Sequence, residues 1–360
     1  MAPLQTYVTP RAILTGSAAK EAIESGWAWP LLGNMAYAAM DVSMREEGTY
    51  KRLGAIIRAA YEKDARHMPA QMRAAIEAQM AALAAPRAAF AGIDLKRPVI
   101  IGVLNVTPDS FSDGGRYTNA DEAVAHAARM IEAGADLIDV GGESTRPGAK
   151  PVDEQEELAR VSPVVGALRS RSIPVSVDTR RALVMRDALA AGAAVVNDIT
   201  ALTFDPRALD TVAQSQASVI LMHMQGTPQT MQDKPTYVWA PGEVYDFLAA
   251  RVTACVGAGI PKARLAVDPG IGFGKDDQHN AQLMDHLGMF HGLGCAVALG
   301  ASRKGFIGRM SKGEGAGERL PGSLAAALDG VSKGAQILRV HDVAETRQAL
   351  AVAGRLAAGT

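Results

Sequence analysis

The chain has 360 residues, of which 48% are hydrophobic and 21% charged, and its formal net charge is −1. This length can hold one α/β barrel of about 250 residues and a smaller unit, and the near-neutral charge does not favour a nucleic-acid partner. The two cysteines, Cys255 and Cys295, exclude a disulfide scaffold, and we expect both to be buried small residues.

The start of the sequence and its apolar runs bear on the location of the protein. The first residues, MAPLQTYVTPR, lack the basic region and apolar core of a secretory signal. No apolar run reaches the roughly 20 residues that a membrane span requires. We therefore predict a cytoplasmic protein without a membrane partner.

Residues 1–94 predict a small helical extension in front of the main domain. They are rich in Ala and Met, and apolar residues recur three or four positions apart in residues 31–44, 50–61 and 69–90. The extension would end in the linker formed by residues 94–98. It carries no motif that can be attached to chemistry, so we interpret it as a helical appendage or an oligomer contact of unknown role.

Residues 95–360 alternate short apolar runs with helical segments rich in Ala, Leu and Glu. The runs are residues 99–104, 136–140, 173–177, 194–196, 218–222, 264–267, 296–299 and 336–340. Apolar strands that alternate with helices indicate a parallel sheet covered on both sides. Eight such units in about 260 residues predict an α/β fold of the (β/α)₈ TIM-barrel type. An open, doubly wound sheet is the alternative, because periodicity does not show closure.

Polar residues follow every one of the eight runs. Because the active site of a barrel forms at the carboxyl ends of its strands, we expect these residues to surround one ligand site. They are Asn105, the segment 143–148, Asp178, Asn197 with Asp198, His223, Asp268, the segment 302–304, and Arg339 with His341.

Four basic side chains of this rim, Arg146, Lys304, Arg339 and His341, indicate an anionic ligand. Arginine offers phosphate a planar fork of donors and lysine offers a point charge. Phosphate sites in barrels frequently follow the seventh and eighth strands. The alternative is that Arg146 and Arg339 pair with rim carboxylates and bind no ligand.

Asp178 and Asp268, with Asn197, indicate the other half of the ligand. A carboxylate near the floor of a barrel mouth is costly to bury without hydrogen-bond donors. A heterocycle with adjacent N–H and NH₂ groups supplies two donors to one carboxylate. Structural or metal-binding aspartates are the alternative.

Several common motifs do not fit the sequence. Residues 268–275, Asp-Pro-Gly-Ile-Gly-Phe-Gly-Lys, have one residue too few between their glycines for a P-loop, and Asp276 stands where Ser or Thr is needed. The seven histidines show no His-Glu-x-x-His pair, which argues against zinc, and there is no Gly-x-Ser-x-Gly elbow. His223 follows an apolar run, and we interpret it as an interior histidine rather than a base.

Eight segments of the rim closely resemble, in family order, the motifs of dihydropteroate synthases. The first two are Leu-Asn-Val-Thr-Pro-Asp-Ser-Phe-Ser-Asp-Gly-Gly at residues 104–115 and Glu-Ser-Thr-Arg-Pro-Gly at residues 143–148. The others are residues 176–179, 197–199, 222–228, 268–275, 300–304 and 339–342. The resemblance runs from about residue 98 to the C-terminus and does not cover residues 1–94. It departs from the family at residues 200–202, where Thr-Ala-Leu replaces the common Ser-Gly-Gly.

The resemblance implies a TIM barrel that joins p-aminobenzoate to 6-hydroxymethyl-7,8-dihydropterin diphosphate, giving 7,8-dihydropteroate and pyrophosphate in folate synthesis. It also implies Mg²⁺ as cofactor, these two small-molecule substrates as partners, a homodimer and a sulfonamide target. Mg²⁺ and the basic side chains would stabilise pyrophosphate as it leaves a pterin methylene cation. The arylamine is unprotonated at pH 7 and would need no strong base.

The resemblance also assigns roles to residues of this chain. The pterin would be held by Asp178, Asn197, Asp268 and Lys304, with Met222, Phe273, Gly300 and Arg339 around its ring. The diphosphate would be held by Asn105, Arg146 and His341, with Mg²⁺ near Asn105. The p-aminobenzoate pocket would be shaped by Phe111, Thr145, Pro147 and Ser302. The catalytic groups would be Asn105, Arg146, Lys304, Arg339 and His341.

Two other functions stay open at this point. A pterin-dependent methyltransferase on a similar barrel would share Asp178 and Asn197, but it would need a corrinoid-binding partner and no diphosphate pocket. A non-catalytic homologue would bind pterin without turnover, and the departure at residues 200–202 allows it. The segments 105–115 and 143–151 are predicted lids that exclude water from the pterin cation.

Overall fold

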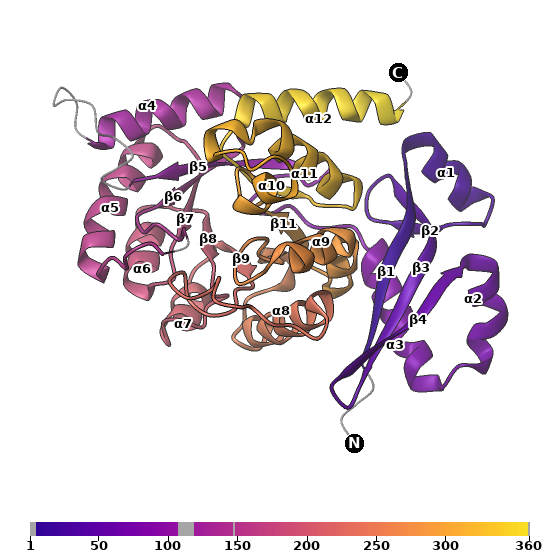
Figure 1. The fold of residues 1–360 in the computed structure, drawn as a ribbon. Helices are drawn as coiled ribbons and strands as arrows, with labels where there is room; N and C mark the ends of the chain where they lie inside the picture. Colours follow the sequence, from indigo (N-terminus) through magenta and orange to yellow (C-terminus); the bar gives the residue numbers. More distant parts are fainter. Residues whose placement is uncertain (1–4, 107–118, 147, 359–360) are drawn as a thin grey trace.

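Figure 1 shows a barrel with an N-terminal unit beside it, in a computed structural model that describes residues 5–106, 119–146 and 148–358. The N-terminal unit, coloured indigo to purple, lies against the side of the barrel that carries α8 (Ala240–Gly257) and α9 (Asp277–Asp285). Within the described residues, no helix is long and apolar enough to cross a membrane.

In the described part of the chain, eight parallel strands close the barrel, and each overlaps one of the predicted apolar runs. They are β5 (Val99–Asn105), β6 (Leu137–Gly141), β7 (Val175–Asp178), β8 (Val195–Asp198), β9 (Ser218–Met222), β10 (Leu265–Asp268), β11 (Ala296–Leu299) and β12 (Ile337–Val340). The last strand pairs in parallel with the first, from Ile337 opposite Val99 to Val340 opposite Gly102. The predicted TIM barrel is therefore confirmed, and the open sheet is wrong.

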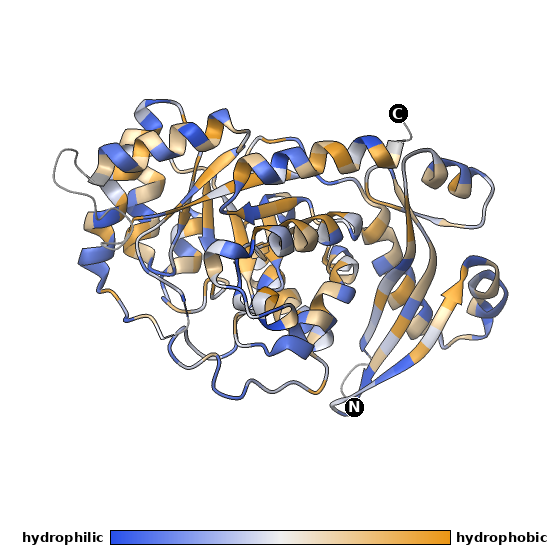
Figure 2. Cartoon of the chain, turned by 45° about the horizontal axis from the view of Figure 1, so that its top comes forward, coloured by the Kyte–Doolittle hydropathy of each residue, from blue (hydrophilic) through white to orange (hydrophobic). Residues whose placement is uncertain are grey.

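Helices cover the outside of the barrel in alternation with the strands. Besides α8 and α9 they are α4 (Asn119–Glu132), α5 (Glu154–Ser170), α6 (Ala182–Ala190), α7 (Ala208–Ala213), α10 (Gly305–Met310), α11 (Leu320–Ser332) and α12 (Val343–Ala358), with the 3₁₀ helices η3 (Lys262–Arg264), η4 (Leu287–Leu293) and η5 (Ala316–Glu318). Alternate residues of the strands other than β7 contribute to two separate apolar clusters, one under the helices and one inside the barrel, whereas β7 contributes only to the first. Figure 2 accordingly shows hydrophobic colours along the barrel strands.

Phe90 closes the amino-terminal end of the barrel. Its backbone N–H and C=O each form a 2.9 Å hydrogen bond with Ile93. Its ring is buried in the inner cluster with Val99, Ile101 and Ile220. Because this end is filled by side chains, the ligand site is left to the opposite end, where the strands have their carboxyl termini.

The N-terminal unit is an antiparallel sheet with helices, and the prediction of a helical extension is wrong. Its strands are β1 (Gln5–Thr15), β2 (Trp29–Leu31), β3 (Met35–Glu46) and β4 (Thr49–Ile57), and its helices are α1 (Gly16–Glu24), α2 (Arg58–Asp64) and α3 (Ala70–Ala84), with η1 (Ala65–His67). β1 pairs with one edge of β3, and β2 and β4 pair with the other edge.

Tertiary packing decides against the helical spacing of residues 31–44. Tyr37 and Met40 of β3 are buried in one cluster with Ile76 and Leu83 of α3, so the sheet buries one face under a helix. Of the three predicted helices only residues 69–90 form one over most of their length, as α3.

Two strand signals were present in the sequence. Residues 6–9, Thr-Tyr-Val-Thr, are β-branched or aromatic, which favours a strand. Glu47 and Gly48 form the two-residue connection between β3 and β4, and their φ angles are both positive, 50° and 81°. A turn of this kind matches the twist of a hairpin.

Charged and aromatic residues join the N-terminal unit to the barrel. Tyr7 of β1 is fully buried, and its hydroxyl group lies 3.0 and 2.9 Å from the two carboxylate oxygens of Asp246 in α8. Arg11 pairs at 2.8 Å with Asp285, the last residue of α9, and at 2.8 Å with Asp41 of β3. The unit is therefore fixed to the barrel at two of its helices.

Arg87, which follows α3, makes a third connection. Its guanidinium donates at 2.9 Å to the backbone carbonyls of His291 and Cys295. Cys255 and Cys295 are both buried and free, as predicted.

Candidate active site

Side chains from four barrel strands form a charged cluster inside the carboxyl end of the barrel. The Arg339 guanidinium donates to Asp139 at 2.6 Å through Nε and to Asp178 at 2.7 Å through Nη2. Asn197 Nδ2 donates to the same oxygen of Asp139 at 3.0 Å. One cation therefore serves two carboxylates, and among the described residues Asp139 Oδ1 has no hydrogen-bond partner.

Asp139 is a residue of this cluster that the sequence analysis missed. It lies in the middle of β6 and is fully buried. The predicted run 136–140 was interpreted as an apolar strand, although a buried aspartate among Leu, Ile and Val is itself a signal of a functional site. The sequence analysis left open that Arg339 pairs with carboxylates of the rim, and the structure shows this pairing.

Burial disfavours the ionised forms of Asp178 and Asp268. Burial raises the pKa of Asp178 to about 7, because the lowering by Arg339 is smaller and Asp139 adds a like charge. Burial also raises the pKa of Asp268, with Lys304 opposing it. Both carboxylates therefore gain from a ligand that brings N–H donors, as the predicted heterocycle does.

Lys304 and Phe273 form one wall of the site. Lys304 Nζ lies 4.5 Å from the centroid of the Phe273 ring and donates to the carbonyl of Ile271 at 2.5 Å. A Cβ at Gly300 would lie 3.6 Å from Asp268 Oδ2 and 3.8 Å from Lys304 Nζ, so Gly300 borders both groups. Burial lowers the pKa of Lys304 to about 8, with Asp268 opposing it.

The glycines of residues 268–275 let two loops lie directly against each other. Gly270 has a φ of 69°, and a Cβ there would lie 2.0 Å from the carbonyl oxygen of His223. Gly274 has a φ of 64°, and a Cβ there would lie 2.4 Å from the carbonyl oxygen of Gln225. Only glycine fits at both positions. The segment that the P-loop comparison rejected thus has a packing role between the loops after β9 and β10.

Ser302, His341 and Arg146 form a second polar group. Ser302 Oγ lies 3.1 Å from His341 Nδ1 and accepts the backbone N–H of His341 at 3.2 Å. The pKa of His341 is lowered to about 4, chiefly by burial. The charge of Arg339 lowers it further, and the charge of Arg146 does so to a smaller extent. His341 is therefore neutral at pH 7. Arg146 is exposed and forms no ion pair with the described residues, unlike Arg339.

Asn105 is the residue expected near Mg²⁺. A Cβ at Gly141 would lie 3.5 Å from Asp178 Cβ and 3.7 Å from Asn105 Oδ1, so these two side chains flank the same glycine. Within the described residues, no group of three or more His, Cys, Asp or Glu could hold a metal ion. A single amide oxygen fits an ion that takes its other ligands from a diphosphate and water.

The remaining predicted residues are placed only in part. Met222 ends β9 and is buried, and Thr145 is half-buried in the loop after β6. Phe111 and Pro147 lie outside the described residues, as does most of the predicted lid 105–115.

The chain is similar to known proteins in sequence and in fold. A family model described as "Pterin binding enzyme" matches residues 101–341. The chain is 48% identical over 261 residues to the dihydropteroate synthase of Escherichia coli strain K12, a match that covers 72% of this chain and 92% of that protein. The chain belongs to the dihydropteroate synthase family.

Solved structures of the dihydropteroate synthase family share the fold. The Xanthomonas albilineans enzyme with 4-aminobenzoic acid is 49% identical, with a TM-score of 0.70, over 74% of this chain and 96% of that chain. The same enzyme in complex with 7,8-dihydropteroate is 46% identical, with a TM-score of 0.67, over 73% and 95%. The Yersinia pestis enzyme with a sulfonamide drug is 48% identical, with a TM-score of 0.69, over 73% and 96%. The family model begins at residue 101, so the N-terminal unit lies outside it.

The departure from the dihydropteroate synthase family at residues 200–202 keeps a left-handed turn. Ala201 and Leu202 have φ angles of 53° and 61°, in the region that favours the glycines common in this family. Asp198 holds the turn, because its carboxylate accepts the N–H groups of Thr200 at 2.6 Å and Leu202 at 3.0 Å. Ala201 and Leu202 thus hold a left-handed backbone at a strain of about 1–2 kcal/mol per residue.

Glu143, the first residue of a family motif, fixes the loop after β6. Its carboxylate accepts from Arg180 at 3.1 Å, from Arg181 at 3.2 Å and from the N–H of Val152 at 3.3 Å. Glu143 therefore has a structural role, whereas the side chains of Thr145 and Arg146 in the same motif stay available to a ligand.

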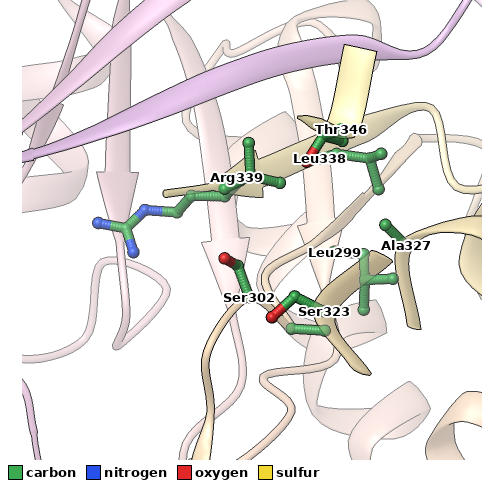
Figure 3. A pocket seen from close by; sticks show the side chains of 9 residues that line it. Leu299, Ser302, Ser323, Ala327, Leu338, Arg339 and Thr346 are labelled. Carbon is green, nitrogen blue, oxygen red and sulfur yellow. The ribbon is translucent and has the colours of Figure 1, made fainter. Parts of the chain in front are cut away.

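A small cavity behind the site is separate from the barrel mouth. Its volume is about 10 Å³, which is room for about one water molecule. Figure 3 shows Ser302 and Ser323 at this cavity, whereas the Arg339 guanidinium points away from it. The other residues around it include Leu299, Ala327, Leu338 and Thr346. It is too small for the substrates of the family.

Proposed function

We propose that the protein is a dihydropteroate synthase that joins p-aminobenzoate to 6-hydroxymethyl-7,8-dihydropterin diphosphate and releases 7,8-dihydropteroate and pyrophosphate. The observation that carries this proposal is the cluster in which Arg339 serves both Asp139 and Asp178, beside Asn197. The relatives support the substrate class, because solved Xanthomonas albilineans enzymes hold 4-aminobenzoic acid and 7,8-dihydropteroate.

The pterin ring presents ring N–H and amino donors that suit Asp178 and Asp268, the two carboxylates whose pKa is raised. Hydrogen bonds to ionised acceptors are roughly twice as strong as neutral ones, and burial strengthens them further. Asp178 and Asp268 are the acceptors in this proposal. Asn197 uses its Nδ2 on Asp139 and so keeps its side-chain oxygen for the ligand. Lys304 donates to the acceptor side of the ring.

The diphosphate is assigned to Arg146, His341 and Asn105. Arg146 forms no ion pair with the described residues, so its guanidinium binds phosphate without first breaking a salt bridge. Asn105 and the diphosphate oxygens would hold Mg²⁺. When bound, this ion stabilises the negative charge that grows on pyrophosphate.

In the proposed reaction, charge develops on pyrophosphate and on the pterin ring, next to these side chains. The C–O bond to diphosphate breaks, its electron pair leaves with pyrophosphate, and the positive charge of the methylene carbon spreads into the pterin ring. The arylamine nitrogen then forms the C–N bond and loses one proton to solvent. Asp178 and Asp268 stabilise positive charge on the ring, which lowers the transition state rather than the ground state alone. No strong base is needed, because the amine is unprotonated at pH 7.

We assign the p-aminobenzoate pocket to residues of the loops after β6 and β11, together with Phe111. Ser302 and Thr145 offer hydroxyl groups, and Phe111 and Pro147 are proposed to complete the pocket. A Yersinia pestis relative holds a sulfonamide drug, and we propose that sulfonamides occupy the same pocket here. We further propose a cytoplasmic homodimer.

Pyrophosphate release by the purified protein tests the function. With the pterin diphosphate and Mg²⁺ present, we expect release only when p-aminobenzoate is added, with an equal amount of 7,8-dihydropteroate formed. Lys304→Met is expected to abolish both products. Binding of the pterin diphosphate with no release under any condition would contradict the synthase and support the non-catalytic homologue.

A further inference from the structure

Lys275 is a fully buried lysine that the proposed chemistry does not use. Its Nζ lies 2.8 Å from the carbonyl oxygen of Phe273, 3.0 Å from His223 Nδ1 and 3.3 Å from the carbonyl oxygen of His223. Among the described residues, no carboxylate is within ion-pair distance of it. Burial, followed by the charge of Lys304, lowers the pKa of Lys275 well below its ordinary value. A buried amino group without an ion-pair partner is costly in either protonation state, so this lysine requires an explanation other than stability.

The three contacts give Lys275 Nζ three hydrogen-bond partners. The two carbonyls are acceptors, and His223 Nδ1 accepts when the ring carries its proton on Nε2. Burial, followed by the charge of Lys275, lowers the pKa of His223 well below its ordinary value, so the ring is neutral. The ring is held in place by Phe247 and Tyr237, whose centroids lie 4.9 and 6.1 Å away.

Lys275 therefore joins the loop after β9 to the loop after β10. His223 begins the first loop, and Phe273 lies in the second. The ring of Phe273 faces Lys304 Nζ at 4.5 Å, and Lys304 in turn is held by the carbonyl of Ile271. Lys275 thus holds the backbone of the residue that forms the aromatic wall of the candidate pterin site.

We propose that Lys275 is a positioning residue for the pterin ring, which acts through the carbonyl of Phe273 and through His223 to fix the Phe273 ring against Lys304. This inference rests on the proposed function, because it assigns Lys275 to the binding of the pterin diphosphate. A displacement of about 1 Å in a positioned wall can cost on the order of a hundredfold in rate. The effect is confined to the pterin, since the contacts of Lys275 do not include Ser302 or Thr145.

Lys275→Met is the first variant, because methionine has a similar length and no donors. We expect the KM for the pterin diphosphate to rise about tenfold or more, and the KM for p-aminobenzoate to stay within about twofold. The melting temperature should change by only a few degrees, because the lost hydrogen bonds are offset by the removal of a buried polar group. Lys312→Met, on an exposed lysine, is the matched control and should leave both KM values unchanged.

Two substitutions of His223 distinguish a positioning role from a merely structural one. His223→Asn can place an amide oxygen near the position of Nδ1 and should retain a pterin KM within about threefold of the parent. His223→Leu cannot accept from Lys275 and should reproduce the Lys275→Met result. The same order should appear in the Kd of the pterin diphosphate measured by calorimetry without p-aminobenzoate.

Two results would overturn the role of Lys275. One is a lower melting temperature for Lys275→Met with an unchanged pterin Kd, and the other is a parallel rise in both KM values. Failure of the proposed function looks different, because a parent protein that binds the pterin diphosphate but releases no pyrophosphate still reports the Kd of each variant. A parent protein that binds no pterin diphosphate contradicts both proposals.

Discussion

In the N-terminal unit two arginines hold one buried carboxylate, whereas at the barrel mouth two buried carboxylates share one arginine. Burial raises the pKa of Asp41, but the hydrogen bonds from Arg52 and Arg11 outweigh it and leave the pKa below its usual value. Burial raises the pKa of Asp178 to about 7, and the shared Arg339 does not reverse this. The first arrangement is complete in the folded chain, and in our proposal the second is completed by the pterin. Four predictions test this difference.

The largest effect is expected at the mouth. Asp178→Asn removes the acceptor of two charge-assisted hydrogen bonds, each worth about 1.5–3 kcal/mol, so kcat/KM for the pterin diphosphate should fall about a hundredfold to ten-thousandfold. The melting temperature should not fall, because the folded state already disfavours this ionised carboxyl. Steady-state kinetics and a thermal melt check both parts, and loss of stability without loss of activity would remove Asp178 from the site.

Asp41→Asn is the matched change in the N-terminal unit, with the opposite expectation. It leaves Arg52 without its carboxylate and Arg11 with Asp285 alone. Removing one partner from a buried ion pair costs about 3–5 kcal/mol, and the partial exposure of both arginines reduces this to about 2 kcal/mol. Chemical denaturation should show that loss, and kcat should stay within about twofold. A large loss of activity in a still-folded variant would contradict the division between the two regions.

The pH dependence of pterin binding is the third test. The ligand donates N–H groups, so it needs Asp178 ionised. As the pH falls below the pKa of about 7, the proton competes with the ligand. The KM for the pterin diphosphate should rise by up to about tenfold per pH unit below 7. Above pH 8, loss of the Lys304 proton should weaken binding as well, because its pKa is lowered to about 8. Asp178→Asn should flatten the acid limb, and an unchanged acid limb in that variant would assign it to another group.

The smallest effect is expected for Arg52→Met. The Arg52 side chain is 64% exposed, and ion pairs of this kind contribute about 0–1 kcal/mol. Arg11→Met should cost more, because Arg11 is 25% exposed and pairs with two carboxylates. Equal melting temperatures for the two variants would show that the junction with α9 adds no stability.

The barrel could be predicted because its strands are buried on both faces and so appear as continuous apolar runs. Asp139 was missed for the same reason, since a single polar residue inside such a run does not change the pattern. The N-terminal sheet was missed because the Ala and Met of β3 have helical spacing and become a strand only through pairing with β1 and packing on α3.

The site was predicted through the resemblance to dihydropteroate synthases, which indicated which residues at the strand ends contact the same ligand. Periodicity placed these residues at the strand ends, but no local pattern shows that Arg339 spans Asp139 and Asp178, 200 and 161 residues away. Lys275 was interpreted only as part of a motif that failed, because its burial against His223 depends on how closely two loops approach at Gly270 and Gly274.

The contacts of β1 have a consequence for how this chain is made. Tyr7 reaches its partner Asp246 across 239 residues, and Arg11 reaches Asp285 across 274 residues. At a synthesis rate of about 5–20 residues per second, the 274 residues from Arg11 to Asp285 take about 14 to 55 seconds to make. During that time, the face of Tyr7 that packs on the barrel in the folded protein is exposed to other nascent chains. β1 can thus pair with β3 early, but it is among the last strands to make its contacts with the barrel.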